Sequence, residues 1–419
     1  MKTTRTLALA LALTFAAGVR ADYLPDPAAA ASALWASPMV AQARAESEAQ
    51  ALRSQSLHQG RSEWTLGADL AGRRIDTAAG EDVAEWGLAL SRPLRLPARA
   101  EADRALGGAL AAHAEANLGE ALHESGRQLL EHWFAWRVEA SQAPLWQAHV
   151  ALAEQQLAAV DARIRLGEAP RADRVNADAA LAQARLQQQQ AAARAQQAHD
   201  RLRAQYPGLA LSADETLPQP VAPAGSAEAH ADAVLAHSHE LLRARRHAEV
   251  LQAETRQLAS RRGVDPAVGM FYKNEMNGDE HVLGVSVGLT LPGAARRTDQ
   301  QAAAALASAA QEAAVRLEQR LRQEARADFD AAVARVEAWQ QADRAAQALA
   351  EAARLAARAY SLGEGGLDQV LLGSRLAQEG ALTARQAQLE ALAANARLML
   401  DAHRLWPLDV DDDSAPAHP

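Results

Sequence analysis

The hydrophobic positions of this chain follow two periods, and the longer one predicts paired helices. One set of positions steps by 3, 4, 3 and 4 residues: Val150, Ala153, Leu157, Val160 and Ile164. A second set steps by 4, 3, 4 and 3: Ala345, Leu349, Ala352, Ala356 and Ala359. Both spacings are those of a coiled-coil seam. The surrounding stretches, residues 98–166 and 294–362, contain no proline except Pro144, and each predicts about 100 Å of helix at about 1.5 Å per residue.

Four shorter segments alternate between apolar and small or polar residues, which predicts strands at about 62–72, 84–93, 266–274 and 281–291. In the last segment Val285, Val287 and Leu289 alternate with Ser286 and Gly288. This pattern is typical of a membrane barrel with a wet interior, and a soluble half-buried sheet shows it too. Four strands cannot close a barrel, whereas three copies of the chain would supply twelve strands, which can.

The chain repeats itself at a nearly constant offset. Leu166-Gly167-Glu168 returns as Leu362-Gly363-Glu364, at an offset of 363 − 167 = 196 residues. The strand that ends at Pro93 returns at Pro292, and Ser37 returns as Ser238, at offsets of 199 and 201. We therefore expect a mainly α fold with a small β part, built from two structural repeats at 22–206 and 227–406 joined by a proline-containing linker at 207–226. Because a glycine commonly ends a helix, each repeat should contain a long helical hairpin, with tips at 166–170 and 362–367.

Composition restricts where such a chain works. Residues 1–21, with Lys2, Arg5 and a short apolar stretch, predict a secretory signal peptide rather than a membrane anchor, which needs about 20 apolar residues. The chain has no cysteine, which excludes a lipid-modified cysteine and favours a bacterial envelope. Loss of three basic leader residues changes the net charge from −9 to −12, so no basic patch for nucleic acid is expected. The acidic residues 407–419 predict a disordered tail rather than a calcium site.

The sequence contains no recognisable catalytic motif, so we expect neither an enzyme nor a cofactor. His237-Ser238-His239, with His230 and His247 nearby, suggests a metal site. Residues two apart on a helix point in different directions, so a solvated surface is the favoured interpretation and metal binding stays open.

The order of these elements resembles that of the outer-membrane efflux proteins of the TolC type. The resemblance covers about residues 23–406 and is most specific in the run from Arg163 to Val175 and in Tyr360-Ser361-Leu362-Gly363. It implies a homotrimer, with a twelve-stranded barrel in outer-membrane lipid and an α-helical tunnel in the periplasm. It also implies a periplasmic adaptor protein and an inner-membrane efflux pump as partners. The protein would be a passive channel for small molecules or ions in a tripartite efflux or type I secretion system.

The resemblance also implies site residues. The adaptor would dock at the two tips, which comprise Leu166, Gly167, Glu168, Tyr360, Leu362, Gly363 and Glu364. Asp368 would line a periplasmic constriction, where three copies would form an acidic ring. Simpler roles stay open, because the glycines can merely end helices and Asp368 can cap the return helix. The chain departs from the family at Leu371, where a second aspartate often stands.

The main alternative is a periplasmic coiled-coil adaptor or scaffold without channel activity. Such a protein would also carry a long hairpin with an exposed tip. It would normally carry a single hairpin, however, so the two equal repeats favour the channel.

Overall fold

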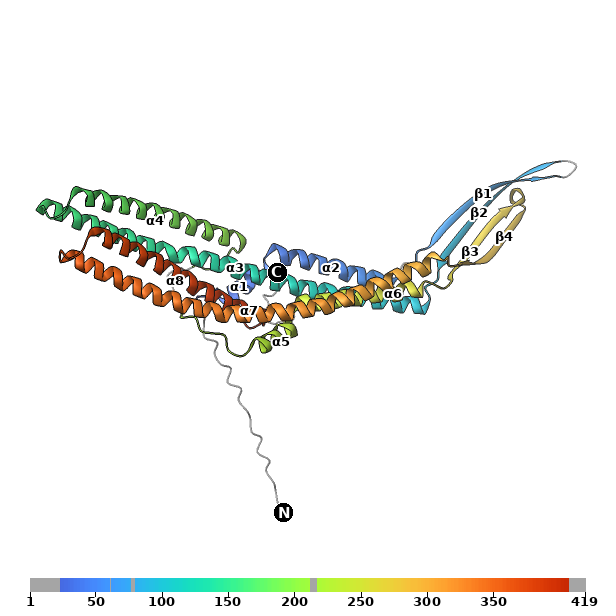
Figure 1. Ribbon diagram of the computed structural model, residues 1–419. Coiled ribbons are helices and arrows are strands. Elements are labelled where there is room, and N and C mark those ends of the chain that lie inside the picture. The colour runs from blue at the N-terminus through green and yellow to red at the C-terminus, as the bar shows by residue number, and fades with distance from the viewer. Residues whose placement is uncertain (1–22, 61, 77–79, 212–216, 407–419) are drawn as a thin grey trace, which may run out of the picture.

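The computed structural model describes residues 23–60, 62–76, 80–211 and 217–406. The molecule is elongated, with a sheet at one end and the tips of two helical hairpins at the other (Figure 1). The predicted signal peptide and the predicted acidic tail lie outside the described residues.

The two halves of the chain contain the same elements in the same order, which confirms the duplicated, mainly helical fold. The first half comprises α1 (Pro27–Trp35), α2 (Pro38–Gln59), β1 (Thr65–Ile75), β2 (Glu81–Pro93), α3 (Pro97–Leu166) and α4 (Arg171–Gln205). The second half comprises α5 (Ala227–His237), α6 (His239–Ser260), β3 (Asp265–Glu275), the short 3₁₀ helix η1 (Met276–Gly278), β4 (Glu280–Thr290), α7 (Ala295–Ser361) and α8 (Leu367–Asp401). Even the caps correspond, because Ser37 and Ser238 accept the N–H groups of Val40 and Leu241 at 3.4 and 3.1 Å.

The long helices bury narrow seams rather than broad faces. In α3 the predicted seam is confirmed, with Val150, Ala153 and Val160 buried against neighbouring helices. In α7 the predicted register is wrong at Ala345 and Ala352, which are exposed. The residues that contact α8 are instead Ala346 and Ala353, whose Cα atoms lie 3.3 and 3.2 Å from where side chains would start at Gly380 and Gly373. In this alanine-rich stretch of α7, the glycines of α8 therefore determine which alanines face α8.

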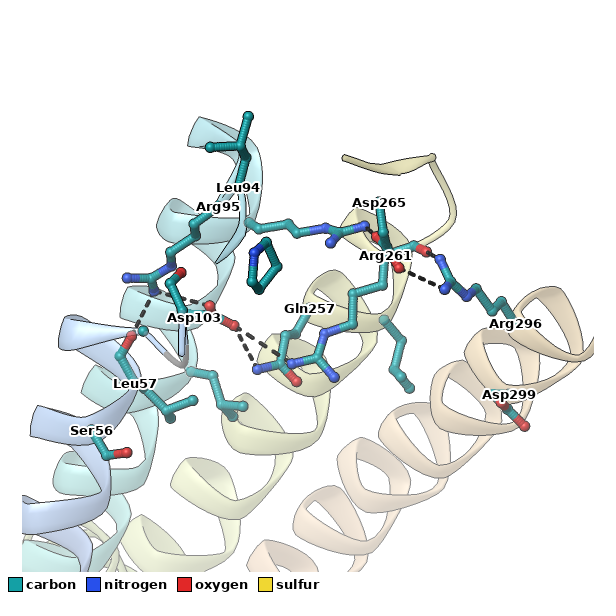
Figure 2. Close-up of a pocket in the computed structure, with 16 residues that line it drawn as sticks. Ser56, Leu57, Leu94, Arg95, Asp103, Gln257, Arg261, Asp265, Arg296 and Asp299 are labelled. Carbon is teal, nitrogen blue, oxygen red and sulfur yellow. Dashed lines mark hydrogen bonds and ion pairs between the residues drawn. The ribbon is translucent and has the colours of Figure 1, made fainter. Parts of the chain in front are cut away.

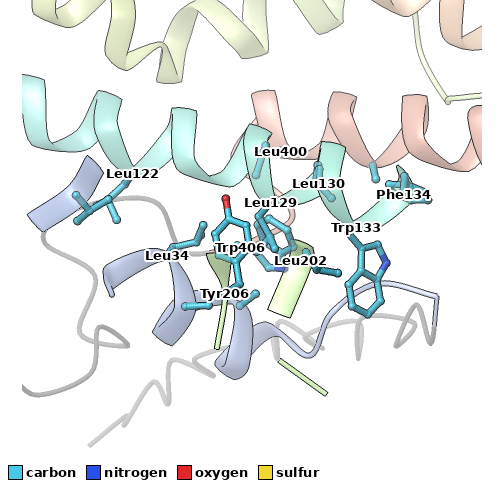
Figure 3. Packing of buried hydrophobic residues seen from close by; sticks show 14 of the residues in the cluster. Leu34, Leu122, Leu129, Leu130, Trp133, Phe134, Leu202, Tyr206, Leu400 and Trp406 are labelled. Atoms are coloured by element: carbon cyan, nitrogen blue, oxygen red, sulfur yellow. The ribbon is translucent and has the colours of Figure 1, made fainter. Parts of the chain in front are cut away.

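The largest hydrophobic core lies at the middle of the molecule, around the centre of α3 (Figure 3). Leu122, Leu129 and Trp133 of α3 are at most 2 % exposed. They belong to one buried cluster with Leu34 of α1, Leu202 of α4 and Leu400 of α8. We call this region the waist. It joins α1, near the start of the chain, and α8, near its end, to α3.

A buried carboxylate fixes the end of α8 to α3 within the waist. Asp401 is 6 % exposed, and its Oδ1 lies 2.9 Å from Arg127 Nε and 3.4 Å from His123 Nε2. Burial alone would raise the pKa of Asp401, but the contact with His123 and the charges of Arg127 and Arg397 outweigh it and lower this pKa to about 2. Asp401 is therefore ionised throughout the physiological pH range.

The sheet is an antiparallel meander in the order β1-β2-β3-β4, and its register sorts residues onto two faces. One face is apolar on every strand and includes Leu66, Leu70, Trp86, Leu88, Leu90, Val268, Met270, Tyr272, Leu283, Val285, Val287 and Leu289. The opposite face carries small residues, such as Gly87, Ala89, Gly284 and Ser286, and charged residues towards the far end. Its one large ring, Phe271, lies over Gly284, where a Cβ would approach the ring to 2.4 Å.

Arginines attach the sheet to the helices (Figure 2). Arg95 donates to the carbonyls of Leu57 and His58 at the end of α2, at 2.6 and 2.8 Å. Arg296 donates to the carbonyls of Arg261 and Gly263 after α6, at 2.6 and 3.2 Å. Since the last carbonyls of a helix have no partner within it, Arg95 caps the end of α2, whereas Arg296 fixes the chain that leaves α6. A cavity of about 710 Å³ lies among these side chains.

We predict that Asp401→Asn destabilises the protein. The substitution leaves Arg127 largely buried without its anionic partner, and breaking such a pair costs about 3 kcal/mol. The contribution of Asp401 is fully present above the unfolded pKa near 4 and is lost as the pH falls towards 2, because the folded state holds the carboxylate ionised. Thermal unfolding of the purified protein at pH 7 measures the effect. Asp200→Asn, at an exposed position on α4, is the control, and equal melting temperatures for the two variants would contradict the assignment.

Candidate functional site

The two hairpin tips have the same backbone geometry. Gly167 directly follows α3 and has φ 76°, and Gly363, two residues after the end of α7, has φ 82°. At the first tip Glu168 N–H donates to Arg163 O at 2.9 Å, and at the second Glu364 N–H donates to Ala359 O at 3.0 Å. Together with the bonds from the glycine N–H groups to Ile164 O and Tyr360 O, each forms a Schellman motif. Both glycines are therefore required by the left-handed conformation.

The tips also present an accessible surface. Leu166 and Leu362 are 73 % and 58 % exposed, and no atom lies within 4 Å of the position where a side chain would begin at Gly167 or Gly363. Glu168 and Glu364 are exposed as well. Each tip thus combines one exposed leucine, one exposed carboxylate and a backbone that a partner can approach closely.

A cation–π contact joins the two tips. Arg163 on α3 places its guanidinium 4.4 Å from the centre of the Tyr360 ring on α7, and its Nη1 donates to Tyr360 O at 2.8 Å. The charge of Arg163 is partly balanced by Glu168, at 3.9 Å from Nε. A cation over an aromatic face contributes about 0.5–1 kcal/mol at an exposed site. Tyr360 is therefore half-buried and belongs to the junction between the tips.

An apolar cluster packs against Tyr360 next to this contact. Val160, Ala177 and Leu367 form a buried cluster that draws one residue from each of α3, α4 and α8. Leu371 packs against the cluster together with Tyr360. Leu371 thus contributes to the apolar packing between the two hairpins.

Asp368 lies in the first turn of α8 and is exposed. The N-cap residue of α8 is Gly366, and its helix start has no side-chain cap hydrogen bond among the described residues. An acidic side chain in the first turn interacts favourably with the helix dipole. The carboxylate is thus available to solvent at the end of the molecule opposite the sheet.

The structure brings the predicted residues together with one that the sequence did not indicate. Arg163 was part of a recognised motif but was assigned no role, because its partner Tyr360 is 197 residues away in the sequence. A signal was nonetheless present, since Arg163 aligns with Ala359 at the repeat offset of 196 and breaks the equivalence of the two tips.

The described part of the chain contains no group of three or more histidine, aspartate or glutamate side chains placed to hold a metal ion. Among the described residues, no helix has both the length and the apolar character needed to cross a membrane.

Comparison with known proteins places the fold. The sequence matches no family profile, and no curated protein is detectably similar in sequence. Solved structures are similar over nearly the whole chain. The outer-membrane channel OprN has a TM-score of 0.74 and 18 % identity, with 90 % of each chain covered. The CmeC outer membrane channel of Campylobacter jejuni has a TM-score of 0.70 and 12 % identity, covering 94 % of this chain and 89 % of that one.

The open state of the MtrE outer membrane channel of Neisseria gonorrhoeae is also similar, with a TM-score of 0.67 and 19 % identity, covering 91 % of this chain and 90 % of that one. At these identities the likeness concerns the fold. The chain has the fold of the outer-membrane channel proteins, as its resemblance to the TolC type predicts.

Proposed function

We propose that the protein is the outer-membrane channel of a tripartite export system and works as a homotrimer. The observation that carries this proposal is the sheet, which has an exposed apolar face on all four strands and two open edges. Val285, Leu70 and Leu283 on that face are 85 %, 88 % and 73 % exposed. Exposure of a continuous apolar patch is unfavourable in water and favourable in lipid.

The strand order supports closure by three copies. Strands β1 and β4 are the two edges of the sheet, each with 11 residues. In an up-and-down meander of four strands, β4 of one copy runs antiparallel to β1 of the next copy. Twelve strands then form a closed barrel without unpaired edges, its apolar face towards lipid and its small and charged residues inside.

The helices would continue this channel away from the membrane. Helix α3 has 70 residues and α7 has 67, so each spans roughly 100 Å at about 1.5 Å per residue. Helix α8 lies between them towards the tips and α6 lies between them towards the sheet, so the long helices run along one layer (Figure 1). Three such layers would form a tunnel that ends at the hairpin tips.

The tips are the proposed docking points for a periplasmic adaptor, which would connect the channel to an inner-membrane pump. Leu166, Gly167, Glu168, Leu362, Gly363 and Glu364 provide the contact surface. Asp368 and the Arg163–Tyr360 contact form the proposed gate. An adaptor without channel activity fits less well, because the two equal repeats and the apolar sheet face have no role in it.

Planar bilayers test the channel itself. We predict that the purified protein conducts ions and prefers cations, and that Asp368→Asn lowers the cation preference because it removes three negative charges from one constriction. The reversal potential in a salt gradient measures the preference. A protein that assembles but conducts no ions would contradict the proposal, and an unchanged reversal potential in the variant would contradict the role of Asp368.

Two valines on one strand test the orientation of the sheet. Val285 lies on the apolar face of β4, and Val282 lies on the opposite face. An arginine facing lipid costs about 2–4 kcal/mol near the bilayer centre, whereas one facing the lumen is tolerated. We therefore predict that Val285→Arg strongly reduces the heat-dissociable trimer in outer-membrane extracts and that Val282→Arg reduces it little. The opposite ranking would reject the barrel.

The contact between the tips gives a test of gating. We predict that Arg163→Ala raises the open probability of the channel in bilayers, since it removes both the hydrogen bond and the cation–π contact to Tyr360. Arg165→Ala removes an equal charge from an exposed position on the same helix and serves as the control. Equal effects of the two substitutions would show that charge, rather than the contact, controls opening.

A further inference from the structure

We infer that the cavity among the arginines, between the sheet and the helices, binds a phosphate group. A single chain forms this site, so the inference goes beyond the proposed channel. Only one source of the phosphate, a phospholipid headgroup, rests on the proposed function.

The lining of the cavity carries more positive than negative side chains. The positive ones come from the start of α3, the end of α6 and the start of α7, and they are Arg95, Arg99, Arg261 and Arg296 (Figure 2). The negative ones are Asp103, Asp265 and Asp299. Four positive and three negative charges leave an excess of one positive charge around a space of about 710 Å³. A volume of this size is typical of a small-molecule site.

Arg261 is the guanidinium most available to a ligand. The one carboxylate oxygen within 4 Å of it, in the described part of the chain, is Asp103 Oδ1 at 3.9 Å, which also accepts from Gln257 Nε2 at 2.8 Å. The other oxygen of Asp103 pairs with Arg95 at 2.9 Å. The Arg261 side chain is 52 % exposed, and a guanidinium has five N–H donors. Arg261 therefore lines the cavity with donors that have no close carboxylate partner among the described residues.

Like charges lie close together at the other side of the cavity. Arg99 and Arg296 both pair with Asp265, so two guanidinium groups share one carboxylate. Burial lowers the pKa of Arg99, and the charges of Arg296 and Arg261 lower it further, against the opposing effect of Asp103. Arginine nevertheless stays charged in proteins. An anion in the cavity would therefore stabilise a cation that its surroundings disfavour.

Two helices begin at this cavity in a way that favours an anion. Neither α3 nor α7 has a side-chain cap hydrogen bond or an acidic residue in its first turn. The first turns carry Arg99 and Arg296 instead, although a cation is unfavourable near a helix N-terminus. By contrast, α4 and α8 each carry an aspartate there. The unpaired N–H groups and the positive end of a helix dipole bind phosphate in many proteins.

The cavity walls are held in place without a ligand. Arg95 is fixed by the carbonyls of Leu57 and His58, at 2.6 and 2.8 Å. Gly60 lies against the same guanidinium, and a Cβ there would come within 2.7 Å of Arg95 Nη1. A site that is already ordered loses less conformational entropy when a ligand binds.

The cavity also lies at the level where the apolar face of the sheet ends. Trp64 precedes Leu66 of that face by two residues and is 60 % exposed, and the guanidinium of Arg92 lies 5.3 Å from the centre of its ring. Arg92 donates to the carbonyl of Ser62, which lines the cavity, at 2.9 Å. Tryptophan is enriched at the boundary between lipid and water. In a sheet that spans the membrane, the cavity would thus lie at the depth of phospholipid headgroups.

Three probes test the inference on the detergent-purified full chain. Native mass spectrometry measures the binding of phosphatidylglycerol and of diacylglycerol, which has the same acyl chains without the phosphate. Calorimetric titration measures the binding of inorganic phosphate. We expect phosphatidylglycerol to bind about tenfold more tightly than diacylglycerol, because arginine–phosphate hydrogen bonds are charge-assisted.

The outcomes distinguish the two sources of the phosphate. Preference for phosphatidylglycerol without binding of inorganic phosphate indicates a lipid headgroup, and binding of inorganic phosphate shows that free phosphate is sufficient. Equal binding of the two lipids without binding of inorganic phosphate would overturn the inference.

Two adjacent arginines provide a matched pair of variants. Arg261→Gln and Arg262→Gln remove the same charge, but Arg262 lies outside the cavity lining and donates to Gln300 at 2.8 Å. We expect Arg261→Gln to weaken binding of the phosphate probe about fivefold and Arg262→Gln less than about twofold. Arg99→Gln should weaken it as well, and it keeps the test decisive if Arg261→Gln fails to fold.

The melting temperature of each variant shows whether it remains folded. Equal weakening by Arg261→Gln and Arg262→Gln, or unchanged binding in the folded variants at Arg261 and Arg99, would overturn the inference. A protein that binds phosphate in this way but conducts no ions would count only against the channel.

Discussion

The bond between Asp401 and Arg127 connects the last turn of the second repeat to the middle of the first. Each repeat is a thin hairpin that cannot form a core by itself, and its long helices bury only narrow seams. The large core around α3 exists because the end of α8 is held there, beside Leu400 and Trp406. A buried charge is stable only when it is paired, so this bond also requires His123 and Arg127 to stay in place. The waist is thus the place where the end of the second repeat is attached to the first.

The sheet is attached by the same means at the other end of the helices. Arg95 binds carbonyls at the end of α2 and Arg296 binds carbonyls just after α6, and they also pair with Asp103 and Asp265, at 2.9 and 2.6 Å. Guanidinium groups suit this role, since one group donates several hydrogen bonds in a fixed plane. Between these arginines and the waist, α3 and α6 meet through a small buried cluster that includes Leu106 and Val250. Directional bonds at two levels therefore position the long helices, in addition to their apolar contacts.

The sequence revealed the elements more completely than the contacts between them. Period and repeat were sufficient for the strands, the hairpins and the α3 seam, because Val150 and Val160 differ clearly from their polar neighbours. The α7 seam was misplaced, since alanine occupies both the inner and the outer positions there. The contact of Arg163 and the bond between Asp401 and Arg127 were not identified because each depends on residues that only folding brings together. Arg127 and Asp401 are 274 positions apart, and no local pattern links them.

The two hairpins differ in how closely their helices pack. In the second, Gly373 and Gly380 let α8 approach the backbone of α7, so the two helices lie close together. In the first, α3 and α4 pack through larger side chains such as Leu181 and are linked by exposed ion pairs, including Arg185 with Glu154. Exposed pairs contribute little to stability. The contact of Arg163 with Tyr360 therefore joins two hairpins whose helices are held together by different means.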